Sequence, residues 1–206
     1  MRTITNLAVV DDQRCTACDI CVRICPVRAI ALEKRGEKKW LAVVDDQKCV
    51  DCRLCVVRCP HYALAMVERD EPMEIGTVAD DVWEKAIAGI CESAHMYPDQ
   101  VICYCHRVQA KEIVAAVLQG AHSPEDVSLA TGARTGCGVL CITGVIRLLR
   151  AAGVMPDKAP GYQWYGINAS IWDVQPDLQE KYSQYYLAED LRAMNELFPG
   201  EGEQSR

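Results

Sequence analysis

Twelve of the thirteen cysteines of this chain fall into three groups whose spacing is typical of metal-binding loops. Two groups share the pattern C-x2-C-x2-C-x3-C-P, and they are Cys15, Cys18, Cys21, Cys25 and Cys49, Cys52, Cys55, Cys59. The third group consists of Cys103, Cys105, Cys137 and Cys141. A C-x2-C-x2-C run brings thiolates around one small volume, as an iron–sulfur cluster needs, and the fourth Cys, followed by Pro, points away from that loop. The cysteines therefore predict one-electron chemistry.

A secreted disulfide framework is the other class of protein that is this rich in cysteine. The cysteine count is odd, the spacing is that of metal loops, and residues 1–13 contain no apolar core or cleavage site of a signal peptide. No apolar run approaches the ~18 residues needed to cross a bilayer. We therefore expect a soluble protein of the reducing cytoplasm, without direct membrane insertion.

The first two cysteine groups lie in an internal repeat, because residues 8–32 recur as residues 42–66 with AVVDDQ unchanged. Each half predicts a short strand, a cluster loop, a turn of helix around the C-P step and a second strand, at 29–33 and 63–67. Arg35 and Gly36 provide a turn between the halves. Since the two cores are small, we expect the clusters to contribute heavily to folding and the metal-free form to be disordered.

Residues 1–67 resemble the bacterial two-cluster ferredoxins, and both cysteine motifs match that family without departure. The resemblance implies that each cluster takes three cysteines from one motif and the fourth from the other. The implied ligands are Cys15, Cys18, Cys21 and Cys59 for one [4Fe–4S] cluster, and Cys49, Cys52, Cys55 and Cys25 for the second. The alternative, in which each motif binds its own cluster alone, is less favoured because the C-P step turns the fourth Cys outward.

Residues 101–153 predict a small helical bundle with the third cysteine group on its loops. Helices are expected at 111–119, at 139–152, and from the N-cap Ser123, with Pro124 in the first turn, to Gly132. C-Y-C-H-R-V at 103–108 and T-G-C-G at 135–138 resemble the [2Fe–2S] domain of bacterioferritin-associated ferredoxin. The resemblance implies a [2Fe–2S] cluster with the ligands Cys103, Cys105, Cys137 and Cys141.

The last cysteine pair departs from that family, because it reads C-x3-C where the family has C-x2-C. Cys91 and His106 are the reserve candidates for the fourth ligand. Cys91 lies on the apolar stripe of an expected helix at 78–94, where it is better explained as a small buried hydrophobe. Zinc is the alternative occupant, since four thiolates suit a tetrahedral ion, but the C-x-C spacing favours iron–sulfur.

The net charge of -7 is concentrated outside the cysteine modules. Residues 68–102 hold two Lys or Arg against nine Asp or Glu, and residues 154–206 hold four against nine. Pro72 and Gly76 in the acidic run 68–77 predict a linker, after which Thr77 caps the helix, with Asp80 and Asp81 in its first turn. The modest local excess of Lys and Arg argues against nucleic-acid binding.

The tail, residues 154–206, is rich in aromatic side chains: Tyr162, Trp164, Tyr165, Trp172, Tyr182, Tyr185, Tyr186 and Phe198. An irregular segment at 160–170 and a helix at 176–197, with Leu178 and the last three tyrosines turned inward, are expected. Aromatic side chains at this density act as anchors. They either pack back onto this chain or dock onto another subunit, and the sequence leaves both open.

Together these features predict an α+β protein with a two-[4Fe–4S] ferredoxin domain at 1–67, an acidic linker and helix at 68–100, a helical [2Fe–2S] domain at 101–153, and a tail at 154–206. No nucleotide-binding, nucleophile-elbow or metalloprotease motif is present, so we expect an electron-transfer protein without a substrate site. Domains like the third occur with flavoproteins, and this resemblance implies a larger, flavin-containing oxidoreductase subunit in a hetero-oligomer. The alternative is a free-standing carrier involved in iron mobilisation or redox sensing.

Overall fold

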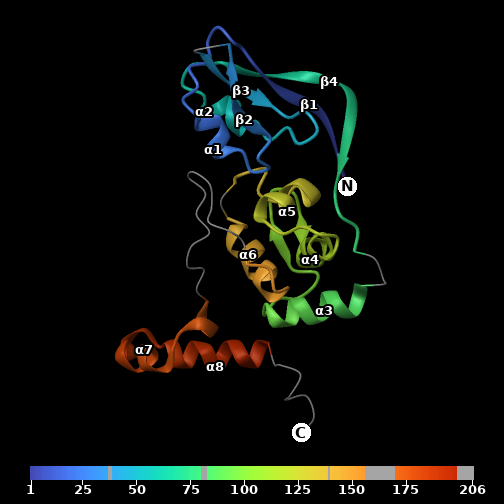
Figure 1. The fold of residues 1–206 in the computed structure, drawn as a ribbon. Helices are drawn as coiled ribbons and strands as arrows, with labels where there is room; N and C mark the ends of the chain where they lie inside the picture. Colours follow the sequence, from blue (N-terminus) through green and yellow to red (C-terminus); the bar gives the residue numbers. More distant parts are fainter. Residues whose placement is uncertain (37–38, 80–82, 139, 156–169, 199–206) are drawn as a thin grey trace.

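The computed structural model describes residues 1–36, 39–79, 83–138, 140–155 and 170–198. Short helices and three two-stranded sheets make up an α+β fold, as predicted. Figure 1 shows the elements arranged along one axis. The strands that carry the repeat lie at one end, a bundle of helices lies in the middle, and the tail helices α7 and α8 lie at the other end.

The first domain pairs its strands across the repeat. Strand β1 (Arg2–Val10) runs antiparallel to β4 (Leu64–Ile75), and β2 (Ile30–Arg35) runs antiparallel to β3 (Lys39–Val44). The first strand of one half therefore pairs with the last strand of the other, which gives the domain its pseudo-twofold symmetry. Helices α1 (Ile20–Ile24) and α2 (Leu54–Arg58) end directly before the two C-P steps.

The prediction of a linker at 68–77 is wrong for residues 68–75, which continue strand β4. Arg2 is paired with Ile75 and Ile4 with Met73, so the end of β4 holds the start of β1. Pro72 is tolerated because it lies in the β-bulge between the pairs Ile4–Met73 and Asn6–Glu68, where the ladder is interrupted. The acidic composition of this segment does not indicate a strand. The buried residues of the strand pair, Ile4 in β1 and Ile75 in β4, are far apart in sequence, so no local pattern connects them.

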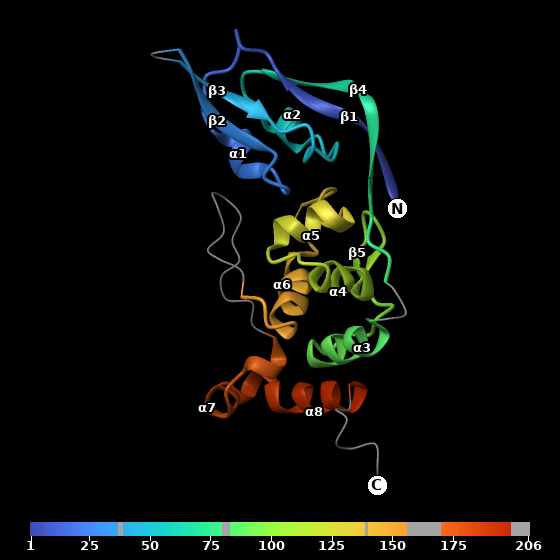
Figure 2. The ribbon, with the colours of Figure 1, turned by 45° about the vertical axis from the view of Figure 1, so that its right-hand side comes forward.

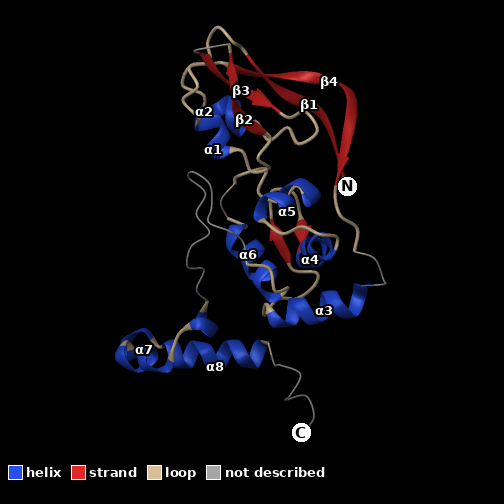
Figure 3. Cartoon of the chain, in the orientation of Figure 1, coloured by secondary structure: helices blue, strands red, loops and turns tan. Residues whose placement is uncertain are grey.

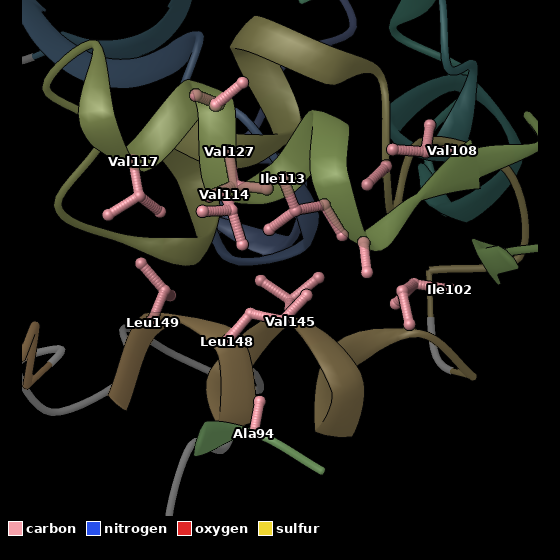
Figure 4. Packing of buried hydrophobic residues seen from close by; sticks show 14 of the residues in the cluster. Ala94, Ile102, Val108, Ile113, Val114, Val117, Val127, Val145, Leu148 and Leu149 are labelled. Atoms are coloured by element: carbon pink, nitrogen blue, oxygen red, sulfur yellow. The ribbon is translucent and has the colours of Figure 1, made fainter. Parts of the chain in front are cut away.

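The second domain is a bundle of α3 (Glu84–Ser93), α4 (Ala110–Leu118), α5 (Pro124–Thr131) and α6 (Ile142–Ala151), with a small hairpin of β5 (Val101–Cys103) and β6 (Val108–Gln109). Figure 4 shows Ile113 and Val114 of α4 facing Val145 and Leu148 of α6 across the core. The predicted start and end of α5 are confirmed. Ser123 Oγ accepts from Asp126 N at 3.1 Å, Pro124 is in the first turn, and Gly132 ends the helix with φ 78°.

Two other predicted helix starts differ from the structure. Helix α3 begins at Glu84 instead of residue 78, because the buried Thr77 hydroxyl donates to Ala130 O at 3.2 Å and is not a cap. Asp80 and Asp81, expected in its first turn, lie outside the described residues. Helix α6 begins at Ile142, and the start predicted for it, residue 139, also lies outside them.

The tail does not form the single helix predicted at 176–197 (Figure 3). Helix α7 (Pro176–Lys181) and helix α8 (Leu187–Leu197) are separated by a 3-10 turn, and Tyr186 has a left-handed φ of 57°. The prediction that four side chains of this segment turn inward is also wrong in this chain. The side chains of Tyr185 and Tyr186 are 65% and 67% exposed, and those of Leu178 and Tyr182 are about 40% exposed. Tyr162, Trp164, Tyr165 and the expected irregular segment up to residue 169 lie outside the described residues.

Other tail aromatics pack back onto the second domain, beyond α3 and α6 (Figure 2). The Trp172 ring stacks on His95 with centroids 3.9 Å apart, and Arg147 lies over its ring at 5.3 Å. Phe198 lies 5.0 Å from the Tyr97 ring, whose hydroxyl donates to Leu197 O at 2.9 Å. The tail therefore divides into aromatics that attach it to this chain and tyrosines that stay exposed.

Among the described helices, none has the length and apolar character to cross a membrane.

The attachment of the tail should depend on pH through His95. Burial first, and then the Arg147 charge, hold the pKa of His95 below its ordinary value of 6.5, while Asp173 opposes this shift. The docked state therefore disfavours the protonated ring, so docking is strongest above pH 6.5 and weakens as the pH falls through the lowered pKa. We expect amide exchange of α8 to accelerate on lowering the pH from about 8 to about 5, after correction for intrinsic exchange rates. A His95→Phe variant should keep the stack and lose this response; the same response in the variant would contradict the assignment.

Candidate functional site: three cysteine sites

One pocket of the first domain contains cysteines of both motifs. Its lining includes Cys15, Cys18, Cys21 and Cys59. Leu32, Ala42 and Leu64 close its apolar side. The structure thus brings together the four cysteines that the family resemblance implies for one [4Fe–4S] cluster. Their role as ligands stays a prediction.

A second pocket contains the complementary set. Its lining includes Cys25, Cys49, Cys52 and Cys55. Ala8, Val27 and Met66 surround these thiols with apolar atoms. Each pocket therefore combines three cysteines of one motif with the fourth of the other, which is the interleaved arrangement rather than one site for each motif.

The two cysteine loops have the same backbone geometry. Residues with left-handed φ recur in both loops at an offset of 34: Ala17, Asp19 and Arg28 in the first, and Asp51, Arg53 and Tyr62 in the second. Such residues are uncommon outside glycine, and they bend a loop sharply around a centre. The paired occurrence gives both loops the same bends, although non-glycine residues occupy these positions.

Backbone amides point at the sulfurs of both sites. Ala29 N donates to Cys25 Sγ at 3.2 Å, and Ala63 N donates to Cys59 Sγ at 3.3 Å, again at equivalent positions of the repeat. Ala8 N donates to Cys49 Sγ at 3.4 Å. Hydrogen bonds to cysteine sulfur favour the thiolate, and they are one of the factors that set cluster potential.

In the metal-free chain, burial makes several thiols of these sites harder to ionise. Burial, followed by the neighbouring cysteines, raises the pKa of Cys21 and Cys52 to about 11 and that of Cys55 to about 12. A thiolate is the form that binds iron, so binding must release protons from these side chains. The donor set of four thiols and inward N–H groups fits an iron–sulfur cluster.

The third site lies at one end of the second domain, where two loops meet. Cys103 and Cys141 are buried, whereas Cys105 and Cys137 are exposed. The hydrogen bond between these two buried thiols is the largest cause of two opposite shifts. It lowers the pKa of Cys103 and raises the pKa of Cys141. The second loop touches the first at Gly136, because a Cβ there would lie 2.6 Å from Cys105 Cβ. The four predicted cysteines therefore converge, with one edge of the site open to solvent.

The reserve candidates for the fourth ligand are placed differently. Cys91 is fully buried in the core of the second domain, and burial alone raises its pKa to about 11. It behaves as the small hydrophobe that its helical position predicted. His106 follows Cys105 and its Nε2 lies 3.4 Å from Arg2 Nη1, in the first domain. In the described part of the chain, no three His, Cys, Asp or Glu side chains are close enough to chelate a single metal ion.

Comparison with family models agrees with both types of site. Residues 14–63 match the 4Fe-4S dicluster domain, and residues 101–151 match the BFD-like [2Fe-2S] binding domain. The chain carries a 4Fe-4S dicluster domain followed by a BFD-like [2Fe-2S] binding domain. No curated protein and no solved structure matches it.

The dicluster domain contains a supporting residue that the sequence analysis missed. Arg69, in the bulge of β4, donates to Cys49 O at 2.6 Å and to Asp46 O at 2.5 Å through Nη2, and to Asn6 O at 3.4 Å through Nε. It therefore fixes the start of the second cysteine loop from the adjacent strand. A signal was present, because Arg69 is the only basic residue in the acidic run 68–77.

In the BFD-like domain, the fourth ligand can be tested by substituting Cys141. We expect Cys141→Ser to abolish the two-iron electron paramagnetic resonance (EPR) signal and to leave the signals of the four-iron clusters, because Cys141 lies beside Cys103 on the closed side of the site. Cys91→Ala is the matched control, since it removes another buried thiol of the same domain and should keep every signal. An unchanged two-iron signal in Cys141→Ser would place the fourth ligand elsewhere, with His106 the next candidate.

Proposed function

We propose that this chain is the iron–sulfur electron-transfer subunit of a multisubunit oxidoreductase. It relays single electrons through two [4Fe–4S] clusters and one [2Fe–2S] cluster, to or from a larger, flavin-containing subunit. The observation that carries the proposal is that cysteine sites of two kinds adjoin in one chain, each belonging to a recognised cluster-binding domain. When bound, such clusters accept or donate one electron at a time.

The surface of the chain supports a partner at the third site. Tyr104 and Leu140 directly precede Cys105 and Cys141 of that site, and their side chains are 77% and 78% exposed. Tyr185 and Tyr186 form a second exposed group in the tail. Aromatic residues are enriched at protein interfaces, and an exposed cluster edge shortens the distance to a partner's redox group.

A reducing compartment such as the cytoplasm suits thirteen cysteines without a disulfide in the structure.

The test is anaerobic purification of the tagged chain from its native source, with identification of co-eluting chains and of flavin. We expect a larger flavin-containing chain in stoichiometric amount, and bleaching of the cluster absorbance when the substrate of that chain is added. A lone monomer that is fully active as a carrier would contradict the subunit assignment. Stoichiometric binding to a ferritin cage would replace it with the iron-mobilising alternative.

A further inference from the structure

Arg2, at the start of β1, connects the two domains through one guanidinium group. Its Nη2 donates to Val50 O at 3.4 Å, and Val50 directly follows Cys49. Its Nη1 donates to Thr135 Oγ1 at 3.2 Å and lies 3.4 Å from His106 Nε2. Thr135 and His106 belong to the two loops of the third site. One side chain thus reaches from the loop of the second four-iron site to both loops of the two-iron site.

A second connection begins at Arg28, three residues after Cys25. Arg28 Nη2 lies 3.2 Å from Glu125 Oε2, and Glu125 also pairs with Arg134 at 3.6 Å. Glu125 and Arg134 are 2% and 3% exposed, so the pairing is within the protein. The backbone of Arg134 hydrogen-bonds to the thiols of Cys103 and Cys141. This connection therefore runs from Cys25 to the closed side of the third site.

Apolar contacts follow the same route. Leu54, which precedes Cys55, approaches Gly138, which follows Cys137: a Cβ on Gly138 would lie 3.7 Å from Leu54 Cδ1. Leu129 of α5 packs against the core of the first domain. Figures 1 and 2 both show α5 at the end of the helical bundle that faces the first domain. The contacts from the first domain to the second therefore start at residues close in sequence to Cys25, Cys49 and Cys55. These three cysteines belong to one and the same predicted four-iron site.

We propose that Arg2 and Arg28 are positioning residues that hold the site of Cys25, Cys49, Cys52 and Cys55 against the two-iron site, so that these two sites are neighbours and the site of Cys15, Cys18, Cys21 and Cys59 is terminal. The proposal extends the relay proposed above by giving its order. The planar guanidinium fork suits this role, because it fixes several acceptors in one geometry. The buried Glu125–Arg134 pair accepts few other arrangements, since separating it would leave charges buried alone.

The test compares the holoprotein with the double variant Arg2→Gln/Arg28→Gln. Arg14→Gln is the matched control, because Arg14 pairs with Asp11 on the exposed side of the first cysteine loop. We expect the double variant to bind the same amount of iron, to exchange the amides of residues 132–135 about tenfold faster, and to lose the EPR spin coupling between the two-iron cluster and a four-iron cluster. The control should behave as the wild type. Unchanged exchange and coupling in the double variant would overturn the proposal.

A second comparison identifies the neighbour even if the double variant does not fold. Cys25→Ser should remove the spin coupling to the two-iron cluster, whereas Cys15→Ser should keep it. The reverse result would make the other site the neighbour and overturn the proposal. These measurements need no partner protein, so they separate a wrong order of sites from a wrong assignment of the chain as an oxidoreductase subunit.

Discussion

Replacing Cys25 by serine is expected to remove the four-iron cluster of the second motif and to leave the cluster of the first motif in place. The reason is that Cys25 lines the pocket of Cys49, Cys52 and Cys55, although it belongs to the motif of Cys15 in the sequence. We expect a loss of about four irons per chain, or of about one if the cluster survives incomplete. Iron analysis and EPR of the reduced protein, compared with Cys49→Ser and Cys15→Ser, measure this effect.

The pattern of lost signals decides between the two modes of ligation. Cys25→Ser should match Cys49→Ser, and Cys59→Ser should match Cys15→Ser. If Cys25→Ser and Cys15→Ser erase the same signal, each motif binds its own cluster and the interleaved arrangement is contradicted. Cys91→Ala controls for the loss of a buried thiol outside the three sites.

Removal of iron should unfold the dicluster domain while the helices of the BFD-like domain persist. Four of the thirteen buried residues in the core of the first domain are cysteines of the two predicted four-iron sites: Cys21, Cys25, Cys49 and Cys55. The second core has twenty buried residues, of which two, Cys103 and Cys141, belong to the third site, and it packs aliphatic side chains of α4 and α6 such as Ile113 and Leu148. Cluster binding is therefore expected to supply more of the folding free energy in the first domain than in the second.

Hydrogen exchange of the holoprotein and of the chelated, reduced protein measures this difference. We expect the amides of β1 and β4 to lose protection by a factor of about one hundred or more, and those of α4 and α6 by much less. Restoring iron and sulfide should restore protection in β1. Protected β1 amides in the metal-free protein would contradict the claim that the clusters hold this domain together.

Local sequence signals predicted the fold well wherever the structure depends on neighbours in the chain. Ser123, Pro124 and Gly132 mark the ends of α5, because capping is a contact over a few residues. The errors arose where distant contacts decide. Thr77 resembles a cap but bonds to Ala130, and the acidic run after Glu68 becomes a strand because β1 is there to pair with it. A left-handed Tyr186 breaks the predicted tail helix, and no glycine or proline indicates it.

The candidate site shows the same limit. Cysteine spacing and the family resemblance predicted the three sets that the structure brings together, since each loop is local and the repeat gives its symmetry. The residues that hold the sites relative to one another were not predicted. Arg2 lies 104 residues from His106 and 133 from Thr135, and no local pattern connects them. The roles of Arg28 and Arg69 were likewise not predicted.

The chain is expected to bind three clusters of two kinds. The most direct measurement is iron, zinc and acid-labile sulfide analysis of the anaerobically purified protein, combined with Mössbauer spectra. The structure and the domain matches predict about ten irons and about ten sulfides per chain, divided between two four-iron components and one two-iron component. About eight irons with about one zinc would contradict the account, because it would make the third site a zinc site.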